Sequence, residues 1–154
     1  MKQRIYIDTS VIGGCEDEEF CQWSIQLFEE FRQGLCIAVV SDLTRKEIEK
    51  APEKVKKVLF SLPDINVEDV FLTEEAEVLA RNYVDGGVVS AKHIVDAQHI
   101  AIASIERVDV LVSWNFRQIV NLGRIHTFNA INLKLGYPIL EIRSPREVIH
   151  EREI

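Results

Sequence analysis

The stretch Arg4-Ile5-Tyr6-Ile7-Asp8-Thr9-Ser10 joins an apolar run to an acid and two hydroxyl residues. Residues 3–8 are rich in Ile and Tyr, so we predict a buried β-strand there. Packing alone rarely explains a strand that ends on an acid followed by two hydroxyls. Taken by itself, however, Asp8 is as readily a turn or N-cap residue as a ligand, and Thr9 and Ser10 share this ambiguity.

Outward from this strand, apolar runs of strand length alternate with stretches of helical periodicity. We predict further strands at residues 35–40, 66–71, 109–113 and 139–142, and helices at residues 17–33, 42–50, 52–62, 73–84, 93–106, 116–121 and 126–135. The continuous apolar run at 35–40 suits a parallel strand that is covered on both faces. The alternation predicts a three-layer α/β/α domain with a mostly parallel central sheet of four to five strands.

Length and composition predict a single domain spanning residues 1–154, with an apolar fraction of 47% that is ample for its core. The net charge of −7 argues against a strongly basic nucleic-acid binder, but it allows an enzyme that holds nucleic acid through a metal and a local basic face. No apolar segment approaches the ~18 residues of a membrane span, and Asp8 interrupts what would be a signal peptide's apolar core. The three cysteines form no Cys-x-x-Cys pair. We therefore expect an untargeted cytoplasmic protein with reduced thiols.

Two further acids accompany Asp8, each at or near the start of a predicted helix. Glu47 follows Leu43 by four residues and shares its helix face, and Asp96 lies in the dense apolar surroundings of residues 93–103. Ligands gather beyond the carboxyl ends of strands in such sheets, where Asp8 falls. An oxygen-rich site with few imidazoles favours Mg²⁺ or Mn²⁺ over Zn²⁺. The alternatives are a solvated helix acid for Glu47 and a first-turn acid that complements the helix dipole for Asp96.

Three polar residues are candidates to support such a site. His99 approximately shares a helix face with Asp96, and we expect it to be hydrogen-bonded near the site. Ser113 ends a predicted strand, as Asp8 does, and Asn115 follows two residues later. Asn115 either supplies a neutral oxygen, orients a metal-bound water or caps the helix predicted at 116–121, and these roles are compatible.

Together these segments resemble the PIN domain, the fold of VapC-type toxins and related metal-dependent ribonucleases, over nearly the whole chain. Its first-strand motif, whose Asp binds metal, is similar to Tyr6-Ile7-Asp8-Thr9-Ser10. The helix that supplies its second acid resembles Leu43-x-x-x-Glu47-Ile48, and its central helix resembles Asp96-Ala97-x-His99-Ile100-Ala101-x-Ala103. One departure lies in Ser113-Trp114-Asn115-Phe116, where Asn115 stands at a position that is often Asp in the family.

The resemblance implies a ribonuclease in which Asp8, Glu47 and Asp96 hold one Mg²⁺ or Mn²⁺, and a metal-activated water hydrolyses an RNA phosphodiester. It implies that Asn115 positions water or a second ion. The residues expected to support this site are Thr9, Ser10, His99 and Ser113. Because Asn115 replaces a carboxylate, we expect weaker metal affinity and no permanently bound second metal. The resemblance also implies an antitoxin partner, and a homodimer, because VapC-type toxins are commonly paired with antitoxins and PIN domains often dimerise.

Basic residues concentrate around Glu47 and predict a positive rim on which RNA lies. They are Arg45, Lys46, Lys50, Lys54, Lys56 and Lys57. The alternative is a solvated helical surface in which neighbouring acids balance these charges. Two other functions stay open. One is a PIN-like module that binds protein or RNA without cutting, which the net charge and Asn115 favour. The other is a hydrolase or phosphatase with Asp8 as nucleophile, although Ser10 stands where such enzymes usually have a second acid.

Overall fold

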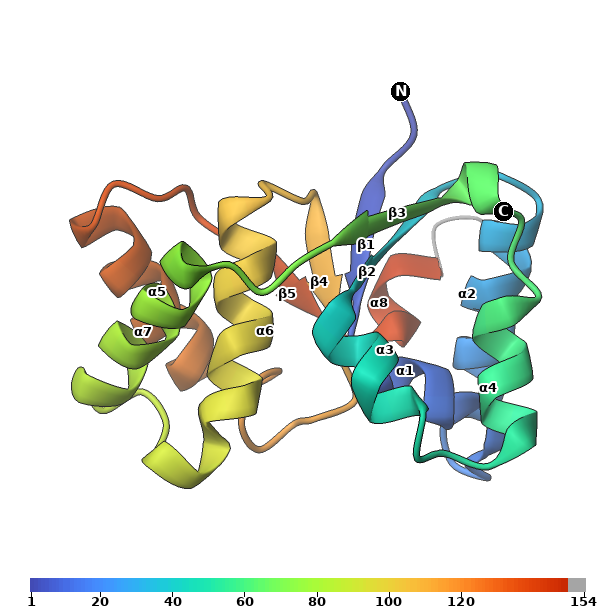
Figure 1. The fold of residues 1–154 in the computed structure, drawn as a ribbon, viewed down its shortest axis with the longest axis horizontal. Coiled ribbons are helices and arrows are strands. Elements are labelled where there is room, and N and C mark those ends of the chain that lie inside the picture. Colours follow the sequence, from blue (N-terminus) through green and yellow to red (C-terminus); the bar gives the residue numbers. More distant parts are fainter. Residues whose placement is uncertain (150–154) are drawn as a thin grey trace.

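A parallel five-stranded sheet forms the centre of the protein, as the computed structural model, which describes residues 1–149, shows (Figure 1). Its strands are β1 (Arg4–Ile7), β2 (Ile37–Ser41), β3 (Val67–Val70), β4 (Val110–Val112) and β5 (Ile142–Arg143). Their order is β3-β2-β1-β4-β5, and every neighbouring pair is parallel. The predicted sheet is therefore confirmed, with β1 at its centre. The predicted domain extends to residue 154, and residues 150–154 lie outside the described part.

Helices cover both faces of the sheet, which gives the three predicted layers (Figure 1). One face carries α1 (Thr9–Gly13), α2 (Cys21–Arg32), α4 (Glu53–Phe60) and α8 (Pro145–Ile149), and the other carries α5 (Glu74–Asp85), α6 (Ile94–Ile105) and α7 (Leu122–Lys134). The helix α3 (Asp42–Ile48) follows β2 directly, and there are short 3-10 turns η1 (Gly14–Glu16), η2 (Asp64–Asn66) and η3 (Ala91–His93). Within residues 1–149, no helix has both the length and the apolar character needed to cross a membrane.

The side chains of β1 show why helices are needed on both faces. Ile5 and Ile7 pack into the core shared with α2 and α4, whereas Tyr6 packs into the opposite core with α5 and α6. All three are almost completely buried, as expected for the central strand of a parallel sheet. Because the strands are parallel, their carboxyl ends lie along one edge of the sheet. The helices α1 and α3 begin at this edge, and the N-terminal end of α6 reaches it (Figure 1).

The segment between β4 and α7 differs from the prediction. The helix predicted at 116–121 is wrong, because this segment is a turn in which the backbone carbonyl of Asn115 accepts from the amides of Ile119 and Val120. Asn121 then adopts an extended conformation (φ −145°, ψ 123°), and its side chain caps α7. The helix predicted at 126–135 consequently begins earlier, at Leu122.

Other predicted elements also differ from the structure. The helix predicted at 17–33 begins only at Cys21, because the Asp17 side chain accepts from the amides of Glu19 and Phe20 and holds them in a turn. The strand predicted at 139–142 is the two-residue β5 instead. The helices α1 and α8 were not predicted, since each has five residues and is too short to show a helical period.

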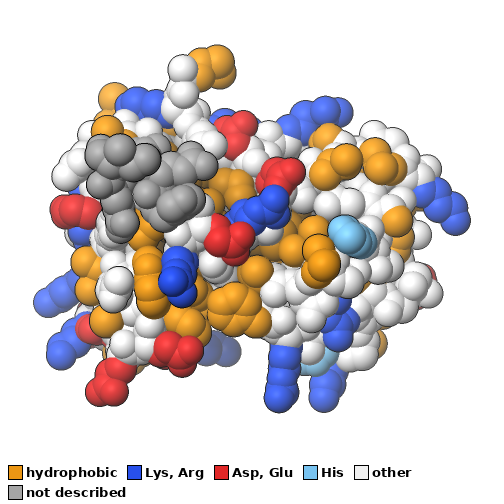
Figure 2. Space-filling view, turned by 180° about the vertical axis from the view of Figure 1, so that it is seen from behind, with side chains coloured by type: hydrophobic (Ala, Val, Ile, Leu, Met, Phe, Trp, Pro, Cys, Tyr) orange, Lys and Arg blue, Asp and Glu red, His pale blue; other side chains and the backbone are white. Residues whose placement is uncertain are grey.

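The face turned away from the viewer in Figure 1 carries apolar side chains at its surface. Figure 2 shows them across the middle of this face, where Asp, Glu, Lys and Arg side chains lie among them, while most other Lys and Arg side chains project from its rim. The middle of this face therefore offers both apolar and charged side chains.

Candidate active site at the carboxyl edge of the sheet

Asp8 follows β1 directly and caps α1. Its backbone is extended (φ −90°, ψ 177°), and its Oδ1 accepts from the amide of Val11 at 3.3 Å. Two hydroxyls also donate to this carboxylate, Ser10 Oγ to Oδ1 and Ser113 Oγ to Oδ2, both at 2.6 Å. The N-cap alternative is thus correct for Asp8, and the cap leaves its second oxygen facing the end of β4.

Burial raises the pKa of Asp8 above its ordinary value, because only 5% of the residue is exposed and water does not stabilise its charge. The nearby His99 and the hydroxyls of Ser10 and Ser113 act in the opposite direction without cancelling the effect of burial. The ionised carboxylate is therefore destabilised where it stands, and added positive charge would stabilise it. A phosphatase with Asp8 as nucleophile would need a second acid two residues later, but Ser10 stands there, and its hydroxyl donates to Asp8 Oδ1.

Glu47 reaches the same edge from α3 and is held by two side chains. Thr9 Oγ1 donates to its Oε1 at 2.8 Å, and His99 Nε2 lies 3.0 Å from the same oxygen. Burial acts to raise the pKa of Glu47, but the hydrogen bond and charge of His99, followed by the bond from Thr9, outweigh it and lower the pKa. Glu47 is therefore not the freely solvated helix acid of the alternative interpretation.

His99 connects Glu47 to the buried core. It is 2% exposed on α6, and its Nδ1 lies 2.6 Å from the Tyr6 hydroxyl. That hydroxyl donates to Ser41 Oγ at 2.8 Å, and the Ser41 hydroxyl also accepts from the amide of Thr44, so it caps α3. Because a carboxylate only accepts, the Nε2–H of His99 donates to Glu47. The predicted hydrogen bonding of His99 near the site is therefore present.

Asp96 lies in the first turn of α6, opposite Asn115. Asn115 Nδ2 donates to Asp96 Oδ1 at 3.3 Å, and His93 Nδ1 lies 3.6 Å from Oδ2. Burial raises the pKa of Asp96, and the charges of Asp8 and Glu47 raise it further against the opposing effect of the two histidines. Asp96 is thus a carboxylate under repulsion from two others.

Asn115 has two functions at once. Its Oδ1 accepts from the amide of Gln118 at 3.0 Å and closes the turn that replaces the predicted helix. The backbone amide of Asn115 donates to Ser113 Oγ at 3.0 Å, and the backbone amide of Trp114 donates to Ser10 Oγ at 2.9 Å. The Asn115 side chain therefore joins the end of β4 to the start of α6 and faces Asp96 with its amide nitrogen.

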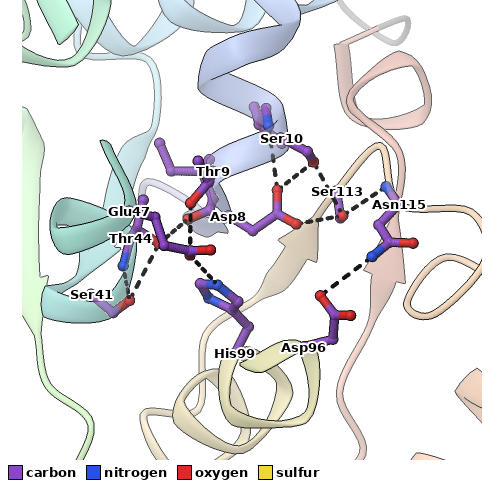
Figure 3. A network of polar contacts seen from close by, with 12 residues as sticks. Asp8, Thr9, Ser10, Ser41, Thr44, Glu47, Asp96, His99, Ser113 and Asn115 are labelled. Atoms are coloured by element: carbon purple, nitrogen blue, oxygen red, sulfur yellow. Dashed lines mark hydrogen bonds and ion pairs between the residues drawn. The ribbon is translucent and has the colours of Figure 1, made fainter. Parts of the chain in front are cut away.

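The predicted site residues gather around one space at the carboxyl edge of the sheet (Figure 3). Its carboxylates come from three different elements, and the His99 side chain extends from α6 toward Glu47. In the conformation of residues 1–149, however, no group of three or more His, Cys, Asp and Glu side chains is arranged to hold a metal ion. The donor chemistry nevertheless fits one, because hard divalent cations prefer oxygen ligands and would offset the repulsion that acts on Asp96.

Two of the six basic candidates lie beside Glu47. A cavity of about 430 Å³ is lined by Leu43, Lys46, Glu47, Lys50 and Val95. The others are placed differently. Arg45 forms an ion pair with Asp69 at 2.7 Å, Lys56 pairs with Glu53 at 3.6 Å, and Lys54 and Lys57 are exposed on α4. The structure thus brings Lys46 and Lys50 to the site and engages Arg45 and Lys56 elsewhere.

Sequence reasoning missed the residues that hold His99 and those beside Asn115. Tyr6 was assigned to the strand core, although a phenol in a buried strand needs a polar partner, which was the available signal. Phe20 and Trp114 stack on each other at 4.2 Å between ring centroids, and no sequence period links two residues so far apart in the chain.

No protein-family model and no curated protein sequence matches the chain. Solved structures do match it. VapC20 of Mycobacterium tuberculosis, described as a toxin that cleaves the sarcin-ricin loop, aligns over 73% of this chain and 91% of its own, with a TM-score of 0.57 and 12% identity.

This chain has a PIN-like fold. VapBC2 of Rickettsia felis, solved with a DNA fragment from its promoter, aligns over 92% of this chain and 98% of its own, with a TM-score of 0.54 and 14% identity. FitAcB of Neisseria gonorrhoeae has the same coverage and identity, with a TM-score of 0.56. At 12% to 14% identity, these structural matches confirm the predicted fold, and they do not by themselves assign an activity to this PIN-like chain.

Proposed function

We propose that the protein is a Mg²⁺- or Mn²⁺-dependent endoribonuclease, of the kind that serves as the toxin of a toxin–antitoxin pair. The observation that carries this proposal is the convergence of Asp8, Glu47 and Asp96 at one edge of a PIN-like sheet, with raised pKa values at Asp8 and Asp96. Burial raises the pKa of both acids, the charges of Asp8 and Glu47 raise that of Asp96 further, and perturbed carboxylates of this kind mark candidate functional sites.

Asp8, Glu47 and Asp96 would hold the divalent ion. When bound, such an ion activates a water molecule and stabilises the negative charge that develops on the phosphate. The protein orients its acids for this task. Ser10 and Ser113 each donate to one oxygen of Asp8. Thr9 and His99 both contact Oε1 of Glu47, and neither of these two contacts involves Oε2.

Asn115 sets the charge of the site. Its amide donates to Asp96, where a carboxylate would repel it. The site therefore carries three acids and one neutral amide, which favours a single resident ion. Asn115 then positions water, or a second ion that arrives with the substrate.

The substrate would be single-stranded RNA, whose backbone phosphate approaches from the side of Lys46 and Lys50. Both lysines line the cavity that Glu47 also lines. Positive charge there offsets the repulsion between phosphate and the three acids. A local basic wall of this kind is compatible with the net charge of −7.

The proposed assembly rests on the likeness to the structural neighbours rather than on contacts of this chain. The structural neighbours include the VapBC2 proteins, so we extend to this chain an antitoxin partner that covers the site, and we retain the homodimer as a prediction. Sedimentation of the purified chain with and without its genomic neighbour measures both.

The alternative is a PIN-like module that binds protein or RNA without cutting, and the Asn115–Asp96 bond favours it because that bond holds the acid without a metal. Cleavage of a labelled single-stranded RNA with Mn²⁺ separates the two. Losing even an outer partner of a metal ligand costs 10- to 100-fold, so we expect Asp8→Asn to lose about 100-fold or more. The control is Asp64→Asn, an exposed acid of η2 at the opposite edge of the sheet, which should cut like wild type. Equal cutting by Asp8→Asn and wild type would contradict the proposal.

A further inference from the structure

A second cavity lies against the candidate active site, on the side away from the lysines. Its volume is about 480 Å³, and it is lined by Ser10, Gly13, Gly14, Asp17, Phe20, Trp114 and Asn115. Two of these residues also belong to the site. Ser10 donates to Asp8, and Asn115 donates to Asp96. The cavity is therefore separated from the carboxylates by single side chains.

Aromatic rings form one wall of this cavity. Phe20 stacks on Trp114 with ring centroids 4.2 Å apart and planes within 12° of parallel. Trp114 Nε1 donates to Ser24 Oγ at 2.9 Å, which fixes the indole, and only 8% of Trp114 is exposed. Phe116, which is 47% exposed, lies 6.1 Å from both rings. The wall is thus a rigid aromatic stack with a further ring beside it at the surface.

Two glycines also line the cavity. A Cβ on Gly14 would lie 2.5 Å from Ser24 Oγ and 2.6 Å from Trp114 Nε1, so a glycine there lets the indole approach the start of η1 closely. A Cβ on Gly13 would meet nothing within 4 Å, because it would point into open space. Gly13 has ordinary helical angles (φ −62°, ψ −27°), so another residue fits its backbone.

We propose that this cavity binds a nucleobase of single-stranded RNA, next to the three carboxylates. The inference rests on the proposed ribonuclease function and names the base-binding part of that site. Flat aromatic rings stack on bases of any sequence, as proteins that bind single strands commonly do.

The charge of the cavity favours a base over a phosphate or an acidic peptide. Asp17 lines it, and Asp96 lies behind Asn115. A phosphate or an acidic side chain would be repelled there, whereas a base is neutral. Asp17 is held at the rim because its Oδ1 accepts from the amides of Glu19 and Phe20 at 2.8 and 3.2 Å. A carboxylate accepts from exocyclic amino groups, so we expect adenine, cytosine and guanine to bind better than uracil.

The test measures binding without Mn²⁺-dependent cleavage, by anisotropy of a fluorescein-labelled 12-nucleotide RNA with Ca²⁺, another cation that takes oxygen ligands, in place of Mn²⁺. Affinities are compared between the intact RNA and a series in which each position in turn is abasic. We expect one abasic position to cost wild type about tenfold, as losing one stacked base does. Gly13→Leu fills the cavity and should bind intact and abasic RNA equally weakly. Phe20→Leu should behave in the same way.

Matched controls carry the same substitutions elsewhere. Gly123→Leu lies at the start of α7, where a Cβ makes only an ordinary 3.5 Å contact with Asn121, and Phe60→Leu removes an exposed ring of α4. Both should retain the abasic penalty, and thermal unfolding shows whether each variant is folded. Absence of RNA binding, or an unchanged abasic penalty in folded Gly13→Leu and Phe20→Leu, overturns the base site. An abasic penalty that disappears in these variants, in a protein that never cuts RNA with Mn²⁺, supports the base site and overturns the ribonuclease function instead.

Discussion

His99 Nε2 lies 3.0 Å from Glu47 Oε1, and its other ring nitrogen lies 2.6 Å from the Tyr6 hydroxyl. One buried imidazole therefore links an acid on α3 to the central strand of the sheet. Because His99 is 2% exposed on α6, its ring has little room to rotate, and its contact with Glu47 holds that side chain in place. The acid reaches the site through the core of the fold rather than by the conformation of α3 alone.

Replacing His99 with Gln should lower Mn²⁺ affinity by about tenfold, because outer partners of metal ligands contribute 10- to 100-fold. Gln retains bulk but does not reproduce the contact with both Tyr6 and Glu47. Calorimetric titration with Mn²⁺ measures the effect. The matched control is His126→Gln, an exposed histidine of α7. Equal affinities in both variants would show that His99 only fills the core.

Asn115→Asp should make the protein less stable without metal and a better Mn²⁺ binder. The Asn115 amide donates to Asp96 Oδ1 at 3.3 Å, and an acid in its place would repel that oxygen. We expect the melting temperature in EDTA to fall by about 3 °C, which corresponds to about 1 kcal/mol for a chain of this size. Saturating Mn²⁺ should raise the melting temperature of the variant by more than that of wild type. A variant that is destabilised equally with and without Mn²⁺ would contradict this prediction.

Asp8→Asn should raise stability in EDTA at neutral pH. Burial raises the folded-state pKa of Asp8, so its ionisation costs stability above that pKa, and the cost disappears as the pH falls through it toward the ordinary Asp value of ~3.9. We expect the variant to melt about 3 °C higher than wild type at pH 7.5, with the gap closing toward pH 4.

Glu47 supplies the contrast for that measurement. Its pKa is lowered in the folded protein, so its charge contributes stability above the ordinary Glu value of ~4.3, which is lost as the pH falls through the folded pKa. Glu47→Gln should therefore melt lower than wild type at pH 7.5. Equal signs for Asp8→Asn and Glu47→Gln would show that the two acids do not differ in this way.

Reversing Lys46 and Lys50 to Glu should weaken binding of single-stranded RNA by about tenfold at low salt and flatten its salt dependence, because both line the cavity beside Glu47. Reversing Lys54 and Lys57, exposed on α4, makes the same charge change and serves as control. Equal losses of RNA affinity from both pairs would support the wider basic rim as the RNA-binding surface. No loss from reversing Lys46 and Lys50 would contradict the proposal that RNA approaches the site past these two residues.

The local sequence pattern was sufficient to predict an element wherever residues close in the sequence determine its structure. The apolar run before Asp8 predicted β1, and the alternation of elements predicted the parallel sheet that brings strand ends together. The pattern failed after β4, because the Asn115 side chain and carbonyl close a turn there that competes with a helix. It also could not find the contact of Tyr6 with His99 or the stack of Phe20 on Trp114, since each pair meets only after the chain has folded.

The central claim is that Asp8, Glu47 and Asp96 hold one divalent metal ion. Crystals soaked in Mn²⁺, with anomalous diffraction collected at the manganese edge, measure this directly. The account predicts one anomalous peak among the three carboxylates in wild type and none in Asp8→Asn. A wild-type crystal with no peak there, or with the same peak in Asp8→Asn, would contradict it.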